Sequence, residues 1–187
     1  MSPGGHLVTT AATAAAVYAG TGSLELTAGL VAGGFLIDVD HVVDYVCFDR
    51  QRDLRPGTFL RYYNEAHFSR IVLLLHSYEV ALLLAVIAWL ANPVWLWGYL
   101  LGMALHLPLD LIFNGRYEPN GVVAFYSFIY RWRARFRGDR LLTGSYLGPT
   151  PPGFLAAFFL GPTVRRPETP AEIARETRPL ILDSTKV

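Results

Sequence analysis

The chain has 187 residues, of which 52% are hydrophobic and only 17% are charged, and its mean hydropathy is +0.32. A soluble domain carries about 25% charged residues, so this composition predicts a small integral membrane protein of one domain. The net charge of +1, with lysine and arginine gathered in loops, does not favour nucleic acid as a partner, and the lone Cys47 excludes an internal disulfide.

Four apolar segments follow one another along the first part of the chain. They run from about residue 6 to 19, 24 to 48, 71 to 91 and 94 to 113. A membrane-spanning helix needs about 20 residues. The last three segments reach this length. The first is shorter, and the sequence does not decide whether it crosses the membrane. Short uncharged turns join the first segment to the second (GTGS, with Ser23 as a candidate N-cap) and the third to the fourth (NP).

The sequence beyond these segments is less apolar. Residues 121–136 predict an amphipathic helix at the membrane surface, and residues 148–163 hold an apolar run that is too short to span, interfacial or re-entrant. We therefore expect an all-α polytopic membrane protein, with about four transmembrane helices in a bundle, a cytoplasmic basic loop and an amphipathic C-terminal segment. Its parts would be a transmembrane bundle (1–114), an interfacial amphipathic or re-entrant segment (115–164) and a polar cytoplasmic tail (165–187).

Arginines are distributed unevenly between the connections. Residues 49–70 carry five arginines, and residues 131–140 carry another five. Cytoplasmic loops of membrane proteins are enriched in arginine and lysine. We therefore expect both stretches and both termini on the cytoplasmic side of a multi-pass protein in the inner (plasma) membrane, with residues 131–140 attached to anionic lipid.

Four of the five histidines fall at matching depths in the four apolar segments. His6 opens the first segment, His41 lies near the end of the second, His76 near the start of the third, and His106 in the second half of the fourth. In the expected topology all four positions belong to the cytoplasmic half of the bundle, whereas His67 lies in the basic loop. The sequence thus predicts one layer in which four imidazoles meet.

Carboxylates accompany these histidines at helical spacing. In the stretch DVDH, Asp40 and His41 share a helical face with Asp44, and Asp38 flanks that face at about 200° from Asp40. Asp38 and Asp40 are therefore expected to have different roles. One would bind a metal ion with His41, and the other would bind a second ion or orient a ligand.

The remaining segments add further candidate ligands. His106 and Asp110 are four residues apart with Pro108 between them, and Glu79 follows His76 by three residues. Imidazoles and carboxylates from several helices are how helical bundles hold metal ions, and a cation offsets the cost of burying carboxylates. A single membrane histidine more often makes a packing hydrogen bond, so it is the convergence that favours a divalent metal. Without thiolates the set suits zinc first, with manganese or iron as alternatives, as one or two ions.

The order of these elements resembles the membrane-bound metal-dependent hydrolase family, also labelled LexA-binding, inner-membrane-associated hydrolases. IDVDH (37–41) matches the family's Pro-Asp-x-Asp-His element except at Ile37, LLLHS (73–77) keeps only the His-Ser of its Arg-Gly-x-Thr-His-Ser element, and HLPLD (106–110) matches its His-x-x-x-Asp element. The resemblance covers about residues 4–114. It implies metal binding by seven residues: His6, Asp38, Asp40, His41, His76, His106 and Asp110.

We expect a membrane-embedded hydrolase in which metal-activated water attacks a lipid or another amphipathic substrate, with Glu79 or Asp44 as general base. Ester, phosphoester and amide bonds are not distinguished by the sequence, and neither is the oligomeric state. Two alternatives stay open. One is a metal or ion transporter, since intramembrane histidines and acids also mark ion pathways, although the outer halves of the third and fourth segments are apolar. The other is a membrane-anchored interaction protein, which would leave the histidine layer unexplained.

Overall fold

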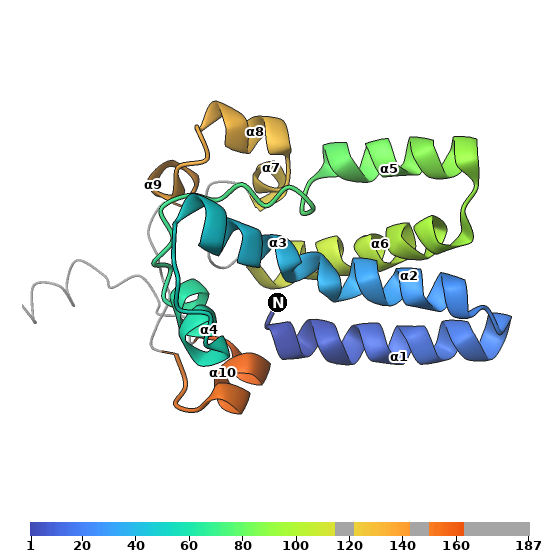
Figure 1. The fold of residues 1–187 in the computed structure, drawn as a ribbon, viewed down its shortest axis with the longest axis horizontal. Helices are drawn as coiled ribbons and strands as arrows, with labels where there is room; N and C mark the ends of the chain where they lie inside the picture. Colours follow the sequence, from blue (N-terminus) through green and yellow to red (C-terminus); the bar gives the residue numbers. More distant parts are fainter. Residues whose placement is uncertain (115–121, 143–149, 163–187) are drawn as a thin grey trace, which may run out of the picture.

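The computed structural model describes residues 1–114, 122–142 and 150–162, and these residues form helices and no β-strand (Figure 1). The predicted all-α class is confirmed. The expected polar tail, residues 165–187, lies outside the described residues.

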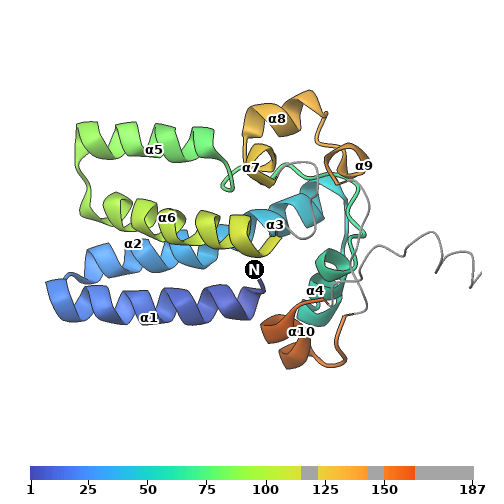
Figure 2. The same ribbon diagram turned by 180° about the vertical axis from the view of Figure 1, so that it is seen from behind.

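Four helices run side by side along the long axis of the molecule (Figures 1 and 2). They are α1 (Pro3–Thr21), α2 (Leu24–Gly34), α5 (Tyr78–Ala91) and α6 (Val94–Asn114). Ser23 accepts a hydrogen bond from the amide of Leu26 and so caps α2, as predicted. Gly22 and Asn92 end α1 and α5 in the left-handed conformation. The two short turns lie at the same end of the molecule (Figure 1).

The second apolar segment is a broken helix rather than a continuous one. Three short elements follow α2: η1 (Leu36–Asp38), α3 (Val39–Val43) and the π-helical turn η2 (Asp44–Phe48). They are bent by 46° from α2. The break is stabilised because the carbonyl of Gly34 accepts hydrogen bonds from Thr10 Oγ1 (2.8 Å) and His106 Nδ1 (3.0 Å). The amide of Asp38 bonds instead to the carbonyl of Phe35. A continuous α-helix through Asp38, as expected from the sequence, is therefore wrong, and Asp38 does not lie at the angle around α2 that such a helix would give it.

The predicted third segment, residues 71–91, is wrong in its first part, because α5 begins only at Tyr78. Side chains satisfy the backbone of the non-helical stretch 71–77. Asp44 accepts hydrogen bonds from two of its successive amides and Asp40 from two more, while Arg131 donates to three of its carbonyls. Buried backbone groups need such partners, and here they come from other elements. The helix α5 keeps 14 residues.

Glycines bring α2 and α6 into backbone contact. Gly29 and Gly33 lie four residues apart in α2, and Gly98 and Gly102 lie four residues apart in α6. A Cβ at Gly33 would lie 2.0 Å from a backbone oxygen of α6, and one at Gly98 would lie 2.1 Å from a backbone oxygen of α2. Small residues at this spacing let membrane helices approach closely. They fix the distance between α6 and the broken helix that follows α2.

The remaining described elements gather at the end opposite the two turns (Figure 1). They are α4 (Pro56–Asn64), α7 (Val122–Phe125), α8 (Phe128–Arg133), α9 (Gly138–Leu141) and α10 (Phe154–Leu160). The amphipathic helix predicted over residues 121–136 is thus two short helices, because the chain turns at Ser127, which caps α8. Phe125 and Tyr126 are buried at this turn and pack on Ile71 and Leu73.

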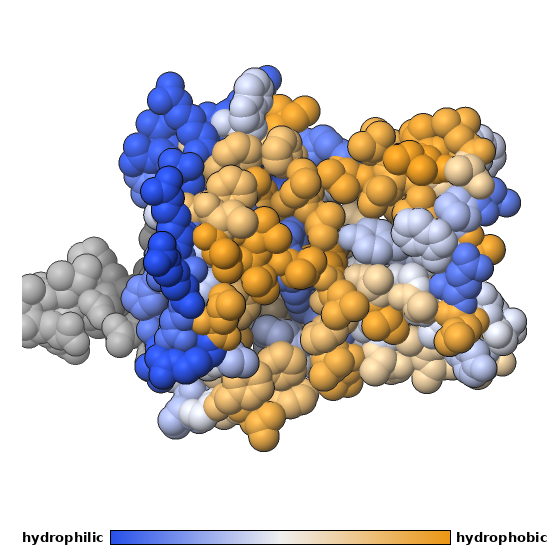
Figure 3. Space-filling model, in the orientation of Figure 1, coloured by the Kyte–Doolittle hydropathy of each residue, from blue (hydrophilic) through white to orange (hydrophobic). Residues whose placement is uncertain are grey.

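One helix, α6, is by itself long and apolar enough to cross a membrane, and the bent run Leu24–Phe48 passes the same test as a pair; only the described residues are covered by this finding. Large apolar side chains are exposed on α5, among them Leu82 (68%), Trp89 (79%) and Leu90 (78%). Figure 3 shows hydrophilic residues gathered at the end that holds α4, α8 and α9, and hydrophobic residues over much of the adjoining face.

Candidate metal centre

Four histidines from four elements meet where the broken helix passes α1, α6 and the non-helical stretch 71–77. His6, His76 and His106 are each 2% exposed or less. The rings of His6 and His106 are stacked with centroids 3.7 Å apart, and those of His76 and His106 are 4.9 Å apart. His41 lies with its ring centroid 5.2 Å from that of His76. The fifth histidine, His67, is exposed and bonds to Glu65.

The centre of this cluster is a contact between two imidazoles. Nε2 of His76 lies 3.0 Å from Nε2 of His106. Nδ1 of His76 donates to Asp40 Oδ2 (3.0 Å) and Nδ1 of His106 donates to the carbonyl of Gly34 (3.0 Å), because neither acceptor carries a hydrogen. In their neutral states both rings therefore turn the lone pair of Nε2 toward each other. That arrangement is repulsive unless a cation or a proton lies beside them.

Two carboxylate oxygens face the same pair of nitrogens. Oδ1 of Asp38 lies 3.2 Å from Nε2 of His76 and 3.5 Å from Nε2 of His106. Oδ2 of Asp110 lies 3.3 Å from Nε2 of His106 and 3.9 Å from Nε2 of His76. Atoms bound to one zinc ion in a tetrahedron, at about 2.0–2.1 Å, lie about 3.3–3.4 Å from one another. The spacings among Asp38, His76 and His106 therefore fit three ligands of a single divalent ion, whereas Asp110 groups with His6 and His106.

Further donor atoms surround this central set. Three buried atoms of the cluster have no hydrogen-bond partner among the described residues: Nδ1 of His6, Oδ1 of Asp40 and Nδ1 of His41. Buried polar atoms are normally partnered. Three overlapping groups of side chains have donor atoms close enough to hold an ion: His6, His106 and Asp110; Asp38, His76 and His106; Asp40, His41 and His76. The buried clusters can thus hold a metal ion, and together these groups contain all seven residues that the family resemblance implies.

Asp38 and Asp40 occupy opposite sides of one imidazole. Asp38 faces Nε2 of His76, whereas Asp40 accepts from Nδ1 of the same ring. The ring of His76 thus has a carboxylate oxygen beside each of its two nitrogens. The pocket between the two acids therefore favours a positive charge.

Asp110 links the centre of the cluster to the start of α1. Its Oδ1 accepts hydrogen bonds from His6 Nε2 (2.9 Å) and from the α-amino group of Met1 (2.7 Å). The same amino group bonds to Asn114 (2.7 Å). The two oxygens of Asp110 thus have different surroundings, one facing α1 and the other facing His106.

The two acids expected from the sequence as general base have other contacts. Asp44 lines the cavity beside the cluster, and its Oδ2 accepts from the amides of Val72 (2.6 Å) and Leu73 (3.1 Å). Glu79 lies outside the cluster. It accepts from Ser127 Oγ (2.6 Å) and from the amide of Phe128 (2.8 Å), at the start of α8. Glu79 therefore binds the N-terminus of α8 and does not contact the cluster.

Arg131 holds the backbone of the stretch that carries His76, a role that was not predicted from the sequence. It is fully buried, and its guanidinium donates to four carbonyls: Phe125, Val72, Leu73 and His76. The expectation that residues 131–140 as a whole attach to lipid is therefore wrong for Arg131. Four arginines stand at alternate positions from 131 to 137, and nothing in this spacing distinguishes the buried one from the others.

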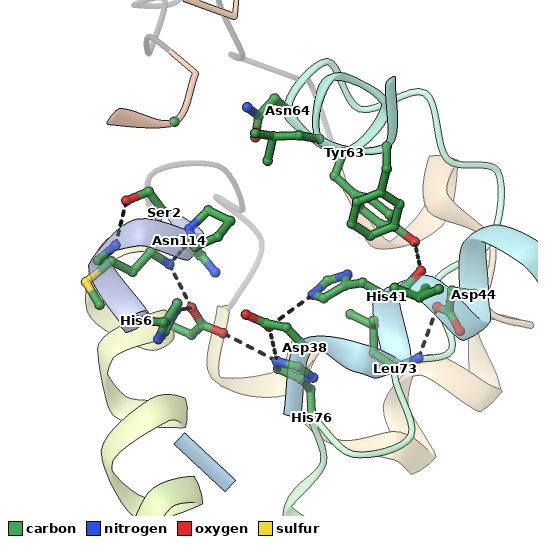
Figure 4. A pocket seen from close by; sticks show the side chains of 18 of the residues that line it. Ser2, His6, Asp38, His41, Asp44, Tyr63, Asn64, Leu73, His76 and Asn114 are labelled. Carbon is green, nitrogen blue, oxygen red and sulfur yellow. Dashed lines mark hydrogen bonds and ion pairs between the residues drawn. The ribbon is translucent and has the colours of Figure 1, made fainter. Parts of the chain in front are cut away.

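A cavity of about 940 Å³ opens beside the cluster. His6, Asp38, His41 and His76 lie on its wall (Figure 4). The rest of its lining is largely apolar. It comes from α3, α4 and α10, and also from the start of α1, the end of α6 and residues between 68 and 73. Tyr63 reaches from α4 to the cluster, where its hydroxyl donates to the carbonyl of His41 (2.6 Å).

Comparison of the chain with protein-family models, with curated proteins and with solved structures found no match. The resemblance to membrane-bound metal-dependent hydrolases therefore rests on the short motifs themselves.

Proposed function

We propose that this chain is a membrane-embedded, metal-dependent hydrolase of lipids or other amphipathic substrates, with a divalent ion in the His and Asp cluster. The observation that carries the proposal is the approach of Nε2 of His76 to Nε2 of His106 at 3.0 Å, with Asp38 beside them, at the wall of a largely apolar cavity. Nitrogen and oxygen donors at tetrahedral spacing suit zinc first, with manganese or iron as alternatives.

The ligands in this proposal are Asp38, His76 and His106, which form one of the three groups, and Asp110 lies beside His106 at 3.3 Å. A divalent ion in such a site acidifies a bound water and withdraws charge from the bond to be cleaved. Hydrogen bonds at Nδ1 orient the two imidazoles. Asp40 accepts from Nδ1 of His76, and a backbone carbonyl accepts from Nδ1 of His106. Such partners fix the tautomer in which Nε2 is free to bind. A second ion at one of the overlapping groups is compatible with the unpartnered atoms.

His41 is the side chain best placed to move a proton. It lines the cavity, its Nε2 lies 3.7 Å from Oδ1 of Asp38, and its Nδ1 has no partner among the described residues. The adjacent carboxylate would stabilise a proton taken up at Nε2. Asp44 is less suited to this role, because its Oδ2 already accepts two backbone hydrogen bonds. His41 replaces it in the proposal.

Four membrane segments would form the bundle: α1, the broken helix Leu24–Phe48, α5 and α6. The two short turns lie at one end and the arginine-bearing loop and helices at the other (Figure 1). This arrangement supports a multi-pass protein of the inner (plasma) membrane with the basic end and both termini in the cytoplasm. In this placement the cluster lies in the cytoplasmic half of the bilayer, within reach of lipid headgroups.

The same cluster supports membership of the membrane-bound metal-dependent hydrolase family. The motifs DVDH, HS and HLPLD that suggested the resemblance all contribute side chains to it. Where the family has proline before DVDH, Ile37 is fully buried in the core next to Met103 and Leu107. That departure serves packing and leaves the adjacent acids in place.

The test is elemental analysis of protein purified in detergent without chelators, followed by assays with ester, phosphoester and amide amphiphiles. We expect about one equivalent of a transition metal in the wild type and metal-dependent hydrolysis of one substrate class. His106→Ala should lose most of the metal, because a ligand is missing and buried carboxylates stay uncompensated.

His67→Ala is the matched control, since this exposed histidine lies outside the cluster, and it should keep both metal and activity. Wild-type protein that holds well under one equivalent after reloading would refute the metal site. Full occupancy without hydrolysis of any of the three bond types would refute the enzyme and leave the site.

A further inference from the structure

The cavity beside the cluster is large, and only part of its wall is polar. Its volume of about 940 Å³ lies near the upper end of the roughly 300–1,000 Å³ that small-molecule sites occupy. The polar side chains of the cluster occupy one part of the wall. The opposite part is built by aromatic and aliphatic side chains of α4 and α10, including Phe59, Leu60, Phe154 and Phe158.

The apolar lining continues to the outer surface. Leu36 and Val39 line the cavity and are 56% and 53% exposed, and on the other rim Leu160 lines it and is 73% exposed. Among the described residues, the exposed part of the lining is mostly apolar, with Arg70 as its one charged member, and such a cavity opens toward an apolar surrounding. In a bilayer that surrounding is the lipid beside the broken helix.

A buried amide marks a second polar point in this apolar part. Asn64, at the end of α4, is 8% exposed and lines the cavity. Its Nδ2 has no hydrogen-bond partner among the described residues. In Figure 4 it lies on the α4 side of the cavity, apart from His6 and Asp38. A buried donor without an acceptor destabilises a protein, so the position is explained if a ligand supplies the acceptor.

We propose that the cavity binds an amphipath with an acyl chain, and that an oxygen of its polar group, an ester carbonyl or a phosphoryl oxygen, accepts a hydrogen bond from Asn64. The chain lies against Phe59 and Phe158 and reaches the bilayer past Leu36 and Val39. The polar group is then held between Asn64 and the His and Asp cluster. This inference rests on the proposed function for what happens at the cluster, and it names the substrate class and the residue that positions it.

The experiment uses the full chain in dodecyl maltoside micelles, because this detergent carries neither an ester carbonyl nor a phosphoryl oxygen and so does not supply the proposed acceptor for Asn64. The probe is an uncleavable ether analogue of lysophosphatidylcholine with a photoactivatable diazirine in its chain. We expect crosslinks to concentrate on the peptides that carry α4 and α10. Asn64→Leu should weaken probe binding about fivefold, the loss of one hydrogen bond. Without probe it should raise the Tm by roughly 2–4 °C, since an unpartnered donor is removed.

Asn114→Leu is the matched control. Asn114 also lines the cavity, but its Nδ2 donates to the hydroxyl of Tyr126 (3.1 Å). Its replacement should therefore lower the Tm, opposite in sign to Asn64→Leu. A lowered Tm for Asn64→Leu would overturn the inference, because the amide would then have a partner within the protein. So would crosslinks spread evenly over α5 and α6 and unaffected by the substitution.

The uncleavable probe separates this inference from the proposed function. Binding at α4 and α10 by a protein that holds no metal would refute the enzyme and keep the amphipath site. A metal-loaded, hydrolytically active protein that does not crosslink there would keep the enzyme and refute the amphipath site.

Discussion

Gly102→Ala tests the contact on which the position of the cluster depends. A Cβ at Gly102 would lie 2.4 Å from the carbonyl oxygen of Leu30 and 2.5 Å from the amide nitrogen of Gly34, whereas ordinary contact begins at 3.4 Å. The two helices would have to separate by about 1 Å at this point. His106 lies one helical turn after Gly102, and its Nδ1 is 3.0 Å from the carbonyl oxygen of Gly34. A displacement of the same size would lengthen this distance beyond that of a hydrogen bond.

The expected cost combines both effects. Inserting a methyl group into a close contact costs about 1–3 kcal/mol, and losing one buried hydrogen bond adds about 1 kcal/mol. We therefore expect the free energy of unfolding, measured by titration with sodium dodecyl sulfate in mixed micelles, to fall by about 2–4 kcal/mol. Metal affinity should fall with it, because the ring of His106 loses its orienting partner.

Gly20→Ala is the control for this substitution. Gly20 lies in α1, and a Cβ there would meet nothing within 4 Å, so alanine should be neutral or stabilise the helix by about 0.5–1 kcal/mol. If Gly102→Ala unfolds at the wild-type detergent fraction and binds metal as tightly as the wild type, α2 and α6 are not in backbone contact. The geometric basis of the cluster would then be refuted.

Substitutions at three further positions separate the roles of the surrounding charges. Asp40→Asn should leave the protein folded but weaken metal affinity about 10–100-fold in a cobalt titration; unchanged affinity would show that Asp40 does not orient His76. Glu79→Gln should destabilise the protein by about 1–2 kcal/mol in the detergent titration and keep full metal content, and loss of metal would contradict its place at the start of α8. Arg131→Met should fail to give a monodisperse folded protein in size-exclusion chromatography, because it leaves four carbonyls without a donor, whereas Arg131→Lys should be recovered with reduced cobalt affinity. Equal yields of the two Arg131 variants would argue against a buried guanidinium.

The convergence of His6, His41, His76 and His106 could be expected from the sequence because it depends on depth and on helical spacing. The arginine placement puts the four positions at one end of the bundle, and the helical spacing of histidines and carboxylates indicates which faces turn inward. The helical class and the cap at Ser23 follow from similarly local patterns.

The breaks in the helices could not be predicted, because their causes are distant in the sequence. The carbonyl of Gly34 is taken by Thr10 and His106, and the stretch 71–77 is held open by Asp44 and Arg131. Periodicity measures a preference within a segment, and here partners from other segments overrule it.

The buried guanidinium has a consequence for how the protein is made. Arg131 lies 55 residues after the histidine whose carbonyl it binds, so every proposed ligand has already been synthesised before this side chain exists. Until then residues 71–77 lack three of their donors, and the continuous helix favoured by their sequence is open to the nascent chain. The stretch can take its final form only after α8 has been synthesised and has docked. Assembly of the centre is therefore a late event in biogenesis, and a chain whose translation stops after α6 would hold all its histidines and still lack the conformation that brings them together.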